Sequence, residues 1–334
     1  MGKVTANLPQ ISIITTSYTM DRFKDIIELL DSIQVQSYKK IETIVVADGA
    51  PELAEKIKNH IHQRGYSDIL VLCNEEKRGL SSARNLGIGQ ASGEIVAFVD
   101  DDAILFPDWA EETAKAYAED SSIIGLTGPI LPLWEDKSMS WFPREFYWIF
   151  SCTYWDWTEP TEVRNGYGTN ISFRREAFDL CGLFSTEIGG VQGRRLHGEE
   201  VELSLRMKRK TGGKIVYNPE VKVEHKVYKY RLKSKFIARS SYWIGYTKCM
   251  LKRLYPEADE GKNLLSTEHQ LLKRIFIKLF PSILKTLFRN PIISWRKLQV
   301  TIIAVSFVAL GYFSYRFQTL LSQGESRSSL GAKI

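Results

Sequence analysis

Apolar and polar residues follow two alternating patterns along the first hundred positions of the chain. Short runs rich in β-branched residues predict strands at residues 11–15, 41–47, 69–73 and 94–99. Between these runs, apolar residues recur at helical spacing and predict helices at residues 22–36, 53–64 and 81–90. The alternation indicates an α/β fold with a mainly parallel central sheet, in which ligands bind at the carboxyl ends of the strands.

The pattern is less regular after residue 127. Residues 127–170 are dense in Trp, Tyr, Phe, Pro and Gly and have no sustained period, which predicts an irregular, aromatic-lined region folded against the sheet. Regular patterns return as a predicted helix at residues 201–210 and predicted strands at residues 214–217 and 221–225. We therefore expect the α/β domain to cover residues 1–226.

The last hundred residues carry a different pattern. Residues 271–288 interleave Lys and Arg with large apolar side chains and are broken by Pro281, which is typical of a basic amphipathic segment on a membrane surface. Residues 300–315 hold no charged side chain and would form a helix of about 24 Å, shorter than a hydrocarbon core of about 30 Å. A buried helix and a transmembrane helix at residues 299–316 both stay open. In either case we expect residues 227–334 to form a helical, membrane-anchoring extension.

Composition and charge narrow the class of protein. The 334 residues are 44% hydrophobic and 25% charged, which excludes a disordered tail, a collagen-like repeat and a polytopic membrane protein. The net charge of +6 hides an asymmetry, because residues 206–299 hold 23 Lys and Arg against 6 Asp and Glu, while the rest of the chain has a net charge of −11. A basic block can bind nucleic acid, an anionic membrane or an anionic ligand. Its place beside the apolar segment favours the membrane and argues against nucleic acid.

The cysteines and the N-terminus bear on the compartment of the protein. Cys73, Cys152, Cys181 and Cys249 form no C-x-x-C pair, so neither a zinc ribbon nor a redox dithiol is supported, and we expect buried, reduced thiols. Residues 1–10 hold one Lys and no apolar run, which does not fit a secretory signal. We therefore expect the α/β domain to stay in the cytoplasm.

Three aspartates follow directly on a predicted strand. Asp100, Asp101 and Asp102 come after the apolar run at residues 94–99. Adjacent carboxylates repel one another unless a cation neutralises them, and their hard oxygen ligands suit Mg²⁺ or Mn²⁺. The alternative is a solvated acidic turn in which Asp102 caps a helix. The triplet alone leaves both readings open.

Other polar groups follow the second and third predicted strands. Asp48 can accept hydrogen bonds from a ribose or a base, or merely close a turn. The segment EKRGLSSARN brings Lys77, Arg78, Gly79 and Arg84 to the start of a helix, where cations and backbone N–H groups suit an anionic ligand. Surface arginines beside a glycine turn are the alternative.

In this order the motifs resemble glycosyltransferase family 2, whose members are inverting enzymes with the nucleotide-sugar-binding GT-A fold. The matching segments are TTSYTMDRF, VVADG, RGLSSARNLG, FVDDDA, YGTNISFRREAF, HGEEVELSLR and VEHK. They lie between residues 11 and 226 in the order expected for the family. The resemblance implies a metal-dependent transferase that uses a nucleotide-sugar donor.

The resemblance also implies roles for individual residues. Asp100 and Asp102 match the D-x-D element, whose Mn²⁺ or Mg²⁺ bridges to the donor diphosphate. His225 matches a position that reaches the metal or the diphosphate in some members, although a lone His is often structural. Glu200 stands where the family has its general base; the pair reads Glu-Glu here, and Glu199 is the weaker choice. The residues implied in nucleotide-sugar binding are Thr15, Ser17, Tyr18, Asp48, Arg78, Arg84, Asp100 and Asp101.

The residues that contact the sugars are less closely defined. Arg174 could pair with a hexuronate carboxylate or support the sheet. Trp157, one of many aromatic residues between 141 and 157, could stack on a sugar ring or pack in the core. Asn170, in the YGTN segment, completes the expected donor and acceptor sugar contacts.

A narrower resemblance covers nearly the whole chain. The segments SYTMDRF, WFPREFYWIF, VRNGYGTNISFRR and LKRLYPEAD, with the terminal apolar segment, are similar to archaeal glucosyl-dolichyl phosphate glucuronosyltransferases. This implies transfer of a hexuronic acid such as glucuronate from a UDP-sugar to a dolichyl-phosphate-linked glycan in protein N-glycosylation. It also implies a single-pass or monotopic protein at the cytoplasmic face of the cell membrane.

Other functions stay open beside this one. The protein could make a dolichyl-phosphate sugar, or a cell-surface polysaccharide, from another nucleotide sugar. A basic, membrane-bound nucleic-acid-binding protein would not need three aspartates at a strand end. A nucleotide-dependent oxidoreductase fits less well, because no G-x-G-x-x-G follows the first predicted strand.

Overall fold

The chain divides into two compact units. The computed structural model describes residues 8–331 except residues 77, 189, 192–193, 196–197 and 257–272. The α/β unit consists of Met1–Leu133, Ser151–Arg194 and Glu199–Val227, and the helical unit of Trp134–Phe150, Arg195–Gly198 and Tyr228–Ile334. The α/β unit thus ends one residue after the predicted domain boundary, whereas residues 134–150 join the helical unit, which no sequence pattern indicates.

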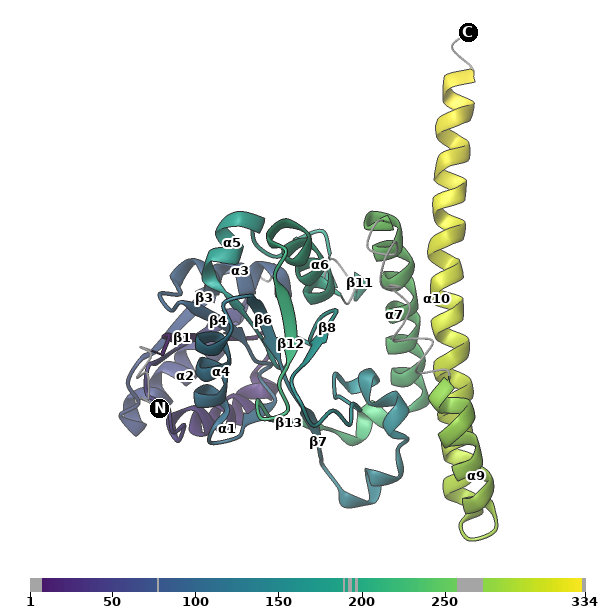
Figure 1. The fold of residues 1–334 in the computed structure, drawn as a ribbon, viewed down its shortest axis with the longest axis horizontal. Coiled ribbons are helices and arrows are strands. Elements are labelled where there is room, and N and C mark those ends of the chain that lie inside the picture. Colours follow the sequence, from purple (N-terminus) through teal and green to yellow (C-terminus); the bar gives the residue numbers. More distant parts are fainter. Residues whose placement is uncertain are drawn as a thin grey trace. The chain divides into compact units, whose positions relative to one another are not determined.

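The α/β unit is built around a mixed, mainly parallel sheet. Within the described residues this sheet has eight strands in the order β3-β2-β1-β4-β9-β6-β12-β8 (Figure 1). Strands β3, β2, β1 and β4 run parallel, as do β6 and β12, whereas β9 is antiparallel to β4 and β6, and β8 to β12. The bounds are β1 (Ile11–Ser17), β2 (Ile41–Asp48), β3 (Ile69–Asn74), β4 (Ile95–Phe98), β6 (Ile123–Thr127), β8 (Thr161–Val163), β9 (Ile171–Arg174) and β12 (Lys214–Tyr217). The predicted α/β fold with a mainly parallel sheet is confirmed.

A smaller sheet lies next to the aspartate triplet. It has the order β5-β13-β7, formed by β5 (Ala103–Leu105), β13 (Val223–Val227) and β7 (Ile130–Trp134). Strand β13 starts two residues later than predicted, so that His225 lies in the middle of the strand. The antiparallel register pairs His225 with Ala103, the residue after Asp102. Two short strands, β10 (Gly190–Val191) and β11 (Arg194–Arg195), pair with each other.

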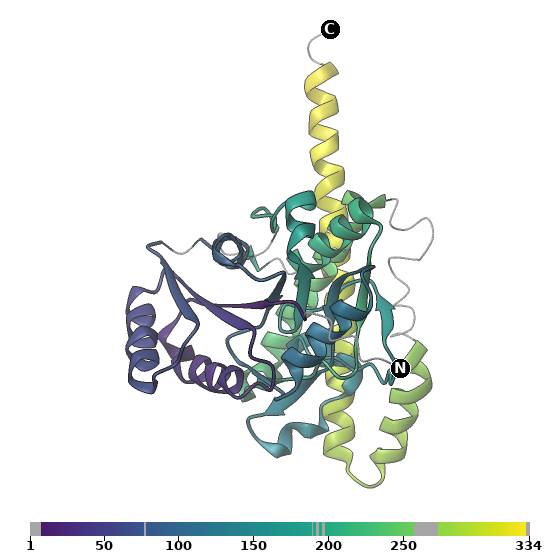
Figure 2. The ribbon, with the colours of Figure 1, turned by 60° about the vertical axis from the view of Figure 1, so that its left-hand side comes forward.

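Helices pack against the strands of the central sheet, as Figure 1 and the turned view in Figure 2 show. Helix α1 buries Ile26, Leu29, Leu30 and Ile33 along one face, which is the pattern of an amphipathic helix. Contacts join α2 and α3 to β1–β3, and α4 and α6 to β6. The bounds are α1 (Phe23–Gln34), α2 (Pro51–Arg64), α3 (Leu80–Gln90), α4 (Trp109–Glu119), α5 (Arg175–Cys181) and α6 (Glu199–Thr211), with a 3₁₀ turn η1 (Met20–Arg22) before α1.

Helix α6 begins earlier than its apolar pattern predicts. The predicted helix starts at residue 201, whereas α6 starts at Glu199 and carries Glu199, Glu200 and Glu202 in its first turn. The N-terminus of a helix favours negative charge because its backbone N–H groups lack partners. Both glutamates considered for proton transfer therefore lie at a helix N-terminus.

The helical unit contains a long pair of packed helices. Helix α10 (Pro291–Gly331) packs along α7 (Ser234–Leu254), as Figure 1 shows. The backbones touch at two glycines: a Cβ on Gly245 would lie 2.0 Å from the Val308 carbonyl oxygen, and a Cβ on Gly311 would lie 1.9 Å from that of Tyr242. The other described elements are η2 (Lys137–Trp141), η3 (Arg144–Phe150), η4 (Lys229–Leu232), the π-helix η6 (Ile275–Leu279) and α9 (Phe280–Leu287).

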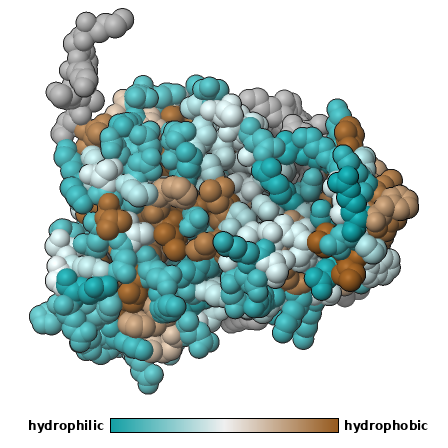
Figure 3. All heavy atoms as spheres, turned by 90° about the horizontal axis from the view of Figure 1, so that it is seen from below, coloured by the Kyte–Doolittle hydropathy of each residue, from teal (hydrophilic) through white to brown (hydrophobic). Residues whose placement is uncertain are grey.

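Helix α10 is long enough to cross a membrane. Its part Pro291–Leu321 is 31 residues long and apolar, and 22% of its most apolar window is buried. At about 1.5 Å per residue it spans about 46 Å. The expectation that residues 300–315 form a helix too short for the hydrocarbon core is therefore wrong, because the helix extends beyond these residues at both ends. Apolar side chains exposed on it include Trp295, Ile302, Val305, Leu310, Phe313, Phe317 and Leu320. Figure 3 shows hydrophobic atoms beside hydrophilic ones at its right-hand edge, the side on which Figure 1 draws α9 and α10.

The four cysteines are free thiols. Cys152, Cys181 and Cys249 are buried as expected, whereas Cys73 is exposed. The expectation of buried thiols is therefore wrong for Cys73, because β3 is the edge strand of the central sheet and has no buried residue.

Candidate active site

The predicted site residues of the first half of the chain gather at one edge of the central sheet. Because β1, β2 and β4 run parallel, their carboxyl ends meet there, with Ser17 level with Ala47 and Ile14 level with Phe98. Thr15 and Ser17 lie at the end of β1, Asp48 ends β2, and Asp100 follows β4 by two residues. The topology thus brings together residues that lie up to 85 positions apart.

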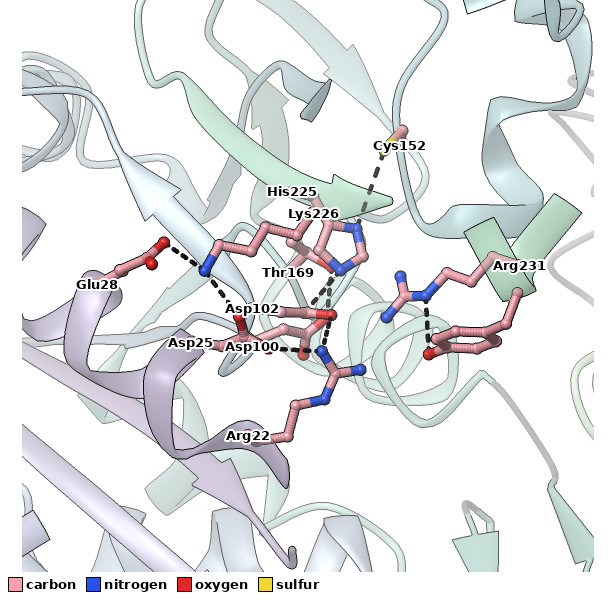
Figure 4. Close-up of polar contacts among 11 residues, drawn as sticks. Arg22, Asp25, Glu28, Asp100, Asp102, Cys152, Thr169, His225, Lys226 and Arg231 are labelled. Carbon is pink, nitrogen blue, oxygen red and sulfur yellow. Dashed lines mark hydrogen bonds and ion pairs between the residues drawn. The ribbon is translucent and has the colours of Figure 1, made fainter. Parts of the chain in front are cut away.

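Asp100, Asp102 and His225 form a cluster that could hold a metal ion. One ligand atom from each lies within 4.8 Å of the others, and Asp102 and His225 are buried (Figure 4). The Nε2 atom of His225 lies 2.8 Å from Oδ1 of Asp102. Two carboxylates and an imidazole are oxygen and nitrogen ligands that suit Mn²⁺ and also Mg²⁺. The donor set therefore fits a divalent cation, and the acidic turn with Asp102 as a helix cap is the weaker reading.

A neighbouring arginine neutralises Asp102. Nη1 of Arg22 lies 3.0 Å from Oδ2 of Asp102 and 2.9 Å from Oδ2 of Asp25 (Figure 4). The Nζ of Lys226 forms ion pairs with Asp25 at 2.8 Å and with Glu28 at 2.6 Å. Both oxygens of Asp102 thus have partners, His225 on one and Arg22 on the other. The sequence analysis did not single out Arg22, although it lies in the motif TTSYTMDRF.

A buried thiol lies behind the imidazole of His225. The Sγ of Cys152 is 3.9 Å from Nδ1 of His225, on the opposite side of the ring from Asp102. When the Nε2 atom of a histidine binds a metal, its Nδ1 carries the proton and donates it to a second group. Cys152 is placed to accept that bond.

Asp101 has an unusual proton affinity. Burial, followed by repulsion from Asp102, raises the pKa of Asp101 to about 7, while a hydrogen bond from Ser17 and the charge of Arg22 oppose the rise. Burial and the neighbouring carboxylates therefore disfavour the ionised form of Asp101.

Arg84 connects Asp100, one of the candidate metal ligands, to the glutamates of α6. Its Nη1 donates a hydrogen bond of 2.8 Å to Oε1 of Glu200 and lies 3.5 Å from Glu199, while its Nη2 lies 3.6 Å from Asp100. Burial alone would lower the pKa of Arg84, but Glu200, Glu199 and Asp100 outweigh it and hold the pKa above its ordinary value. The rings of Phe98 and Phe184 lie 5.7 and 5.4 Å from the guanidinium carbon and pack beside it. Arg84 is therefore a fixed, charged bridge.

Glu200 is the more accessible of the two glutamates. Its side chain is 14% exposed, against 4% for Glu199. A base that takes a proton from a bound hydroxyl must reach that hydroxyl, so accessibility favours Glu200. Its role remains a prediction.

The YGTN segment closes the site. A Cβ on Gly168 would lie 2.2 Å from Oε1 of Glu200 and 2.1 Å from Nη2 of Arg84, so only glycine fits beside this ion pair. The hydroxyl of Thr169 donates a 2.5 Å hydrogen bond to Oδ2 of Asp100. The segment is one of the motifs seen in the sequence, but the roles of Gly168 and Thr169 were not predicted, because they depend on contacts more than 30 positions away.

Two buried hydroxyls lie at the end of β1, and that of Thr15 has no partner among the described residues. Thr15 and Ser17 are 1% and 3% exposed; the Thr15 oxygen makes no hydrogen bond, whereas the Ser17 hydroxyl lies near the carboxylate of Asp101. Unpaired buried polar groups are uncommon in native proteins and often mark a place where a ligand binds. Tyr18, the next residue, is 53% exposed.

Asp48 organises the loop before α3. Its carboxylate accepts hydrogen bonds from the backbone N–H groups of Arg78 and Gly79, at 3.0 and 2.8 Å, and from the side chain of Asn74 at 3.0 Å. The side chain of Arg78 is exposed. Lys77, also considered in this loop, lies outside the described residues. Asp48 thus fixes the loop backbone, and Oδ2 of Asp48 keeps one acceptor position for a further bond.

The three residues considered for sugar binding lie in different environments. Arg174 pairs with Ile95 at the start of β4, the opposite end from Asp100, and its guanidinium donates to the carbonyls of Ile123 and Tyr117. Asn170 is 1% exposed and uses its amide to join Trp109 and Val221. The side chain of Arg174 therefore does not lie at the site. The side-chain amide of Asn170 is already used in hydrogen bonds that hold the fold. Trp157 is half-buried, within a stack of aromatic rings.

Comparisons with known proteins agree with this geometry. A glucosyl-dolichyl phosphate glucuronosyltransferase of Haloferax volcanii is 31% identical over 312 residues, covering 93% of this chain and 96% of that protein. The mannosyltransferase PcManGT of Pyrobaculum calidifontis, solved with GDP-Man and Mn²⁺, has a TM-score of 0.57 at 19% identity, over 96% of this chain and 81% of that one. GalNAc-T7, solved with UDP, GalNAc and Mn²⁺, has a TM-score of 0.54 at 17% identity, over 80% of this chain and 54% of that one.

The two structural likenesses support the GT-A fold. The family model of Glycosyl transferase family 2 matches residues 12–181, which include the aspartate triplet, Arg84 and the YGTN segment. Together with the relative that matches along almost the whole length of both chains, this match leads to one conclusion: the chain belongs to glycosyl transferase family 2 and is a glycosyltransferase with the GT-A fold.

Proposed function

We propose that this protein is a metal-dependent, inverting glycosyltransferase that moves a hexuronic acid, such as glucuronate, from a UDP-sugar to a dolichyl-phosphate-linked glycan in protein N-glycosylation. The observation that carries the substrate proposal is the 31% identity to the Haloferax volcanii enzyme over 96% of that enzyme. The similarity includes both units of the chain, so it also covers the part that would meet the lipid.

The donor is proposed to bind at the carboxyl ends of β1, β2 and β4. The unpaired hydroxyl of Thr15, with Ser17 close by, would hydrogen-bond the nucleoside, and the loop that Asp48 fixes would line the same side. Asp100, Asp102 and His225 would hold Mn²⁺ or Mg²⁺, which neutralises the charge that grows on the departing nucleoside diphosphate. For that, Arg22 must share Asp102 with the cation or leave it.

The chemical step is proposed to be a single displacement. Glu200 accepts the proton of an acceptor hydroxyl, whose oxygen forms a bond to the anomeric carbon while the bond from that carbon to the diphosphate oxygen breaks. The attack comes from the face opposite the leaving group, so the configuration inverts. Arg84 donates a 2.8 Å hydrogen bond to Glu200 and so holds its side chain in place before the hydroxyl arrives.

The acceptor lipid is proposed to meet the helical unit. Basic side chains such as Lys273, Arg274, Lys285, Arg289, Arg296 and Lys297 precede the apolar part of α10. Cationic residues beside an apolar helix favour anionic lipid headgroups and the cytoplasmic face. We propose a catalytic domain at residues 1–226 and a membrane anchor at residues 227–334, single-pass or monotopic.

A donor and acceptor screen tests this function. The full chain, in membranes or detergent with Mn²⁺ or Mg²⁺, is offered UDP-glucuronate, UDP-glucose, UDP-N-acetylglucosamine or GDP-mannose, with dolichyl phosphate or glucosyl dolichyl phosphate. We expect mass spectrometry to detect a hexuronic acid on the glycolipid acceptor. Transfer to dolichyl phosphate alone, or from another donor alone, would overturn the substrate proposal.

The same assay tests the base. Glu200→Gln removes the proton acceptor but keeps the shape of the side chain, so we expect transfer to fall by at least about 1,000-fold with donor binding retained. Glu199→Gln is the matched control and is expected to lose much less activity. The reverse order would assign the base to Glu199.

A further inference from the structure

A stack of aromatic rings ends at Tyr167, the residue before the glycine that lies against Glu200. The rings of Trp155 and Trp157 are 4.7 Å apart and inclined by 24°, and the ring of Tyr167 lies 6.4 Å from Trp155 at 25°. Tyr217 meets both tryptophans edge-on, at 5.4 and 5.2 Å. We call Trp157, Trp155 and Tyr167, with Tyr217 behind them, the aromatic ladder.

The aromatic ladder differs from the aromatic packing of the core. In the core, Phe98, Phe173, Phe178 and Phe184 meet at angles of 58–88° and are at most 4% exposed. The three stacked rings of the ladder are near parallel and half-buried, while Tyr217 alone is buried like the core rings. Trp155 and Trp157 pack against the hydrophobic core. Because Trp155 lies between the other two rings, a ligand could reach only the ring edges and the outer faces of Trp157 and Tyr167.

The chain connects this ladder directly to the proposed base. Tyr167 precedes Gly168, the glycine pressed against Glu200 and Arg84, and Thr169 binds Asp100. A tight turn holds this segment, because the N–H of Asn170 donates a 2.9 Å hydrogen bond to the carbonyl of Tyr167. One end of the ladder is thus a single residue away from the contact with Glu200.

The ladder and the donor residues lie on different halves of the sheet. Thr15, Asp48 and Asp100 follow β1, β2 and β4, whereas Tyr217 ends β12 and Trp157 precedes β8, at the other end of the strand order β3-β2-β1-β4-β9-β6-β12-β8. A displacement with inversion needs the acceptor on the side of the anomeric carbon opposite the nucleotide. The half of the sheet that carries the ladder meets that need.

We propose that the aromatic ladder borders the acceptor site, where sugar rings of the lipid-linked glycan stack on the outer faces of Tyr167 and Trp157. This inference rests on the proposed function. Sugar rings have apolar C–H faces and polar edges, so they fit half-buried aromatic surfaces whose borders stay hydrated. The sugar nearest Tyr167 offers its hydroxyl to Glu200.

Kinetics of Trp157→Ala test the proposal. We expect the KM for the glycolipid acceptor to rise about tenfold or more, since loss of one aromatic contact at about 1.4 kcal/mol is a factor of ten. The KM for the nucleotide sugar and the slow hydrolysis of the donor without acceptor should stay within about twofold. Trp157→Phe keeps a flat ring and should retain most of the acceptor affinity.

The matched control is Tyr66→Ala. Tyr66 is half-buried and meets His60 edge-on near α2, away from the ladder. An acceptor KM that rises no more in Trp157→Ala than in Tyr66→Ala, or a donor KM that rises equally, would overturn the proposal. Thermal denaturation of each variant identifies loss of folding, and Trp157→Phe then decides.

A binding measurement separates failure of this inference from failure of the proposed function. Glucosyl dolichyl phosphate in detergent is titrated into wild type and variants, and the tryptophan fluorescence is followed. We expect a saturable change in wild type and Tyr66→Ala, with weaker affinity in Trp157→Ala. Sugar transfer by wild type with unchanged acceptor affinity in Trp157→Ala refutes only the ladder, whereas absence of transfer with every donor and acceptor refutes the proposed function. Absence of a saturable change in wild type refutes the ladder in either case.

Discussion

Asp100, Asp102 and Glu200 each have a basic partner from their own chain. Arg22 lies on Asp102, and Arg84 lies on Asp100 and Glu200. A buried carboxylate without a partner costs several kcal/mol, so these arginines stabilise the protein before any cation or donor arrives. The same arrangement means that a metal ion must compete with Arg22 for Asp102.

Replacement of Arg22 should expose this competition. In Arg22→Gln we expect Mn²⁺ affinity to rise about tenfold, because no fixed cation holds Oδ2 of Asp102, and the metal-free protein to lose about 1–3 kcal/mol of unfolding free energy. Electron paramagnetic resonance of free Mn²⁺ and denaturation with and without Mn²⁺ measure both. Lys24→Gln, 88% exposed at the start of α1, is the control. Equal or weaker Mn²⁺ affinity in Arg22→Gln would contradict the competition.

Asp101 should make the metal-free protein sensitive to pH. Its pKa is raised to about 7 from an ordinary value near 3.8, so the folded state keeps a proton that the unfolded state has already released. Stability is therefore lost as pH rises from about 4 to about 7. In EDTA, the stability of Asp101→Asn relative to wild type should increase across that window by about 2–4 kcal/mol, measured by urea denaturation. A constant difference would contradict this, and Asp179→Asn, an exposed carboxylate, is the control.

At the scale of helices and strands, the sequence predicted best those elements whose apolar residues follow a single clear period. The strands and helices up to residue 98 follow their apolar patterns because each buries one face or both faces in the core. Strands β5 to β9 escaped prediction, since runs of three to five residues are too short to show a clear period. The start of α6 was also missed: Glu199 and Glu200 are polar and add nothing to an apolar pattern, yet the helix N-terminus stabilises them.

The contact between α7 and α10 depends on two glycines. In Gly245→Ala the new methyl group would lie 2.0 Å from a backbone oxygen of α10, so the helices must move apart. We expect the free energy of unfolding to fall by about 1–3 kcal/mol, seen as a lower Tm of the full chain in detergent. Gly89→Ala on α3, where nothing lies within 4 Å, is the control and should be neutral or stabilising. Equal effects of the two substitutions would contradict the close contact.

At the scale of the whole molecule, the chain combines a charged catalytic unit with an apolar helix. The acidic and basic halves of the sequence correspond to aspartates that need a cation and to a helical unit rich in Lys and Arg. Helix α10 exposes apolar side chains along its length, which is unusual for a protein surface in contact with water alone. A lipid-linked acceptor gives a reason for both features.

Charges on the exposed face of α10 test its contact with lipid. Ile302 and Phe313 are 55% and 60% exposed, so Ile302→Lys with Phe313→Lys should leave packing intact. In a bilayer each Lys costs about 2.5–3.5 kcal/mol near the centre of a spanning helix, and we expect the variant to be extracted by alkaline carbonate while wild type stays in the membrane pellet. Leu180→Lys with Leu183→Lys, exposed in the α/β unit, is the control. Retention of the α10 variant would contradict a lipid-embedded helix.

The sequence by itself determined the α/β fold, the family and the order of the motifs, because local periodicity and short motifs depend only on residues that are close in the sequence. Only the tertiary structure decided which side chains meet. Arg22 on Asp102, Arg84 between Asp100 and Glu200, and Gly168 against Arg84 and Glu200 depend on contacts across 16 to 116 positions. These contacts are set by parallel strand register and by the pairing of β13 with β5. Arg174 is an example of a motif residue that the fold keeps away from the site, because it pairs with Ile95 at the end of β4 opposite Asp100. The charge of each residue can be read from the sequence, whereas the electrostatics of the site depend on distances between charged atoms, which only the fold sets.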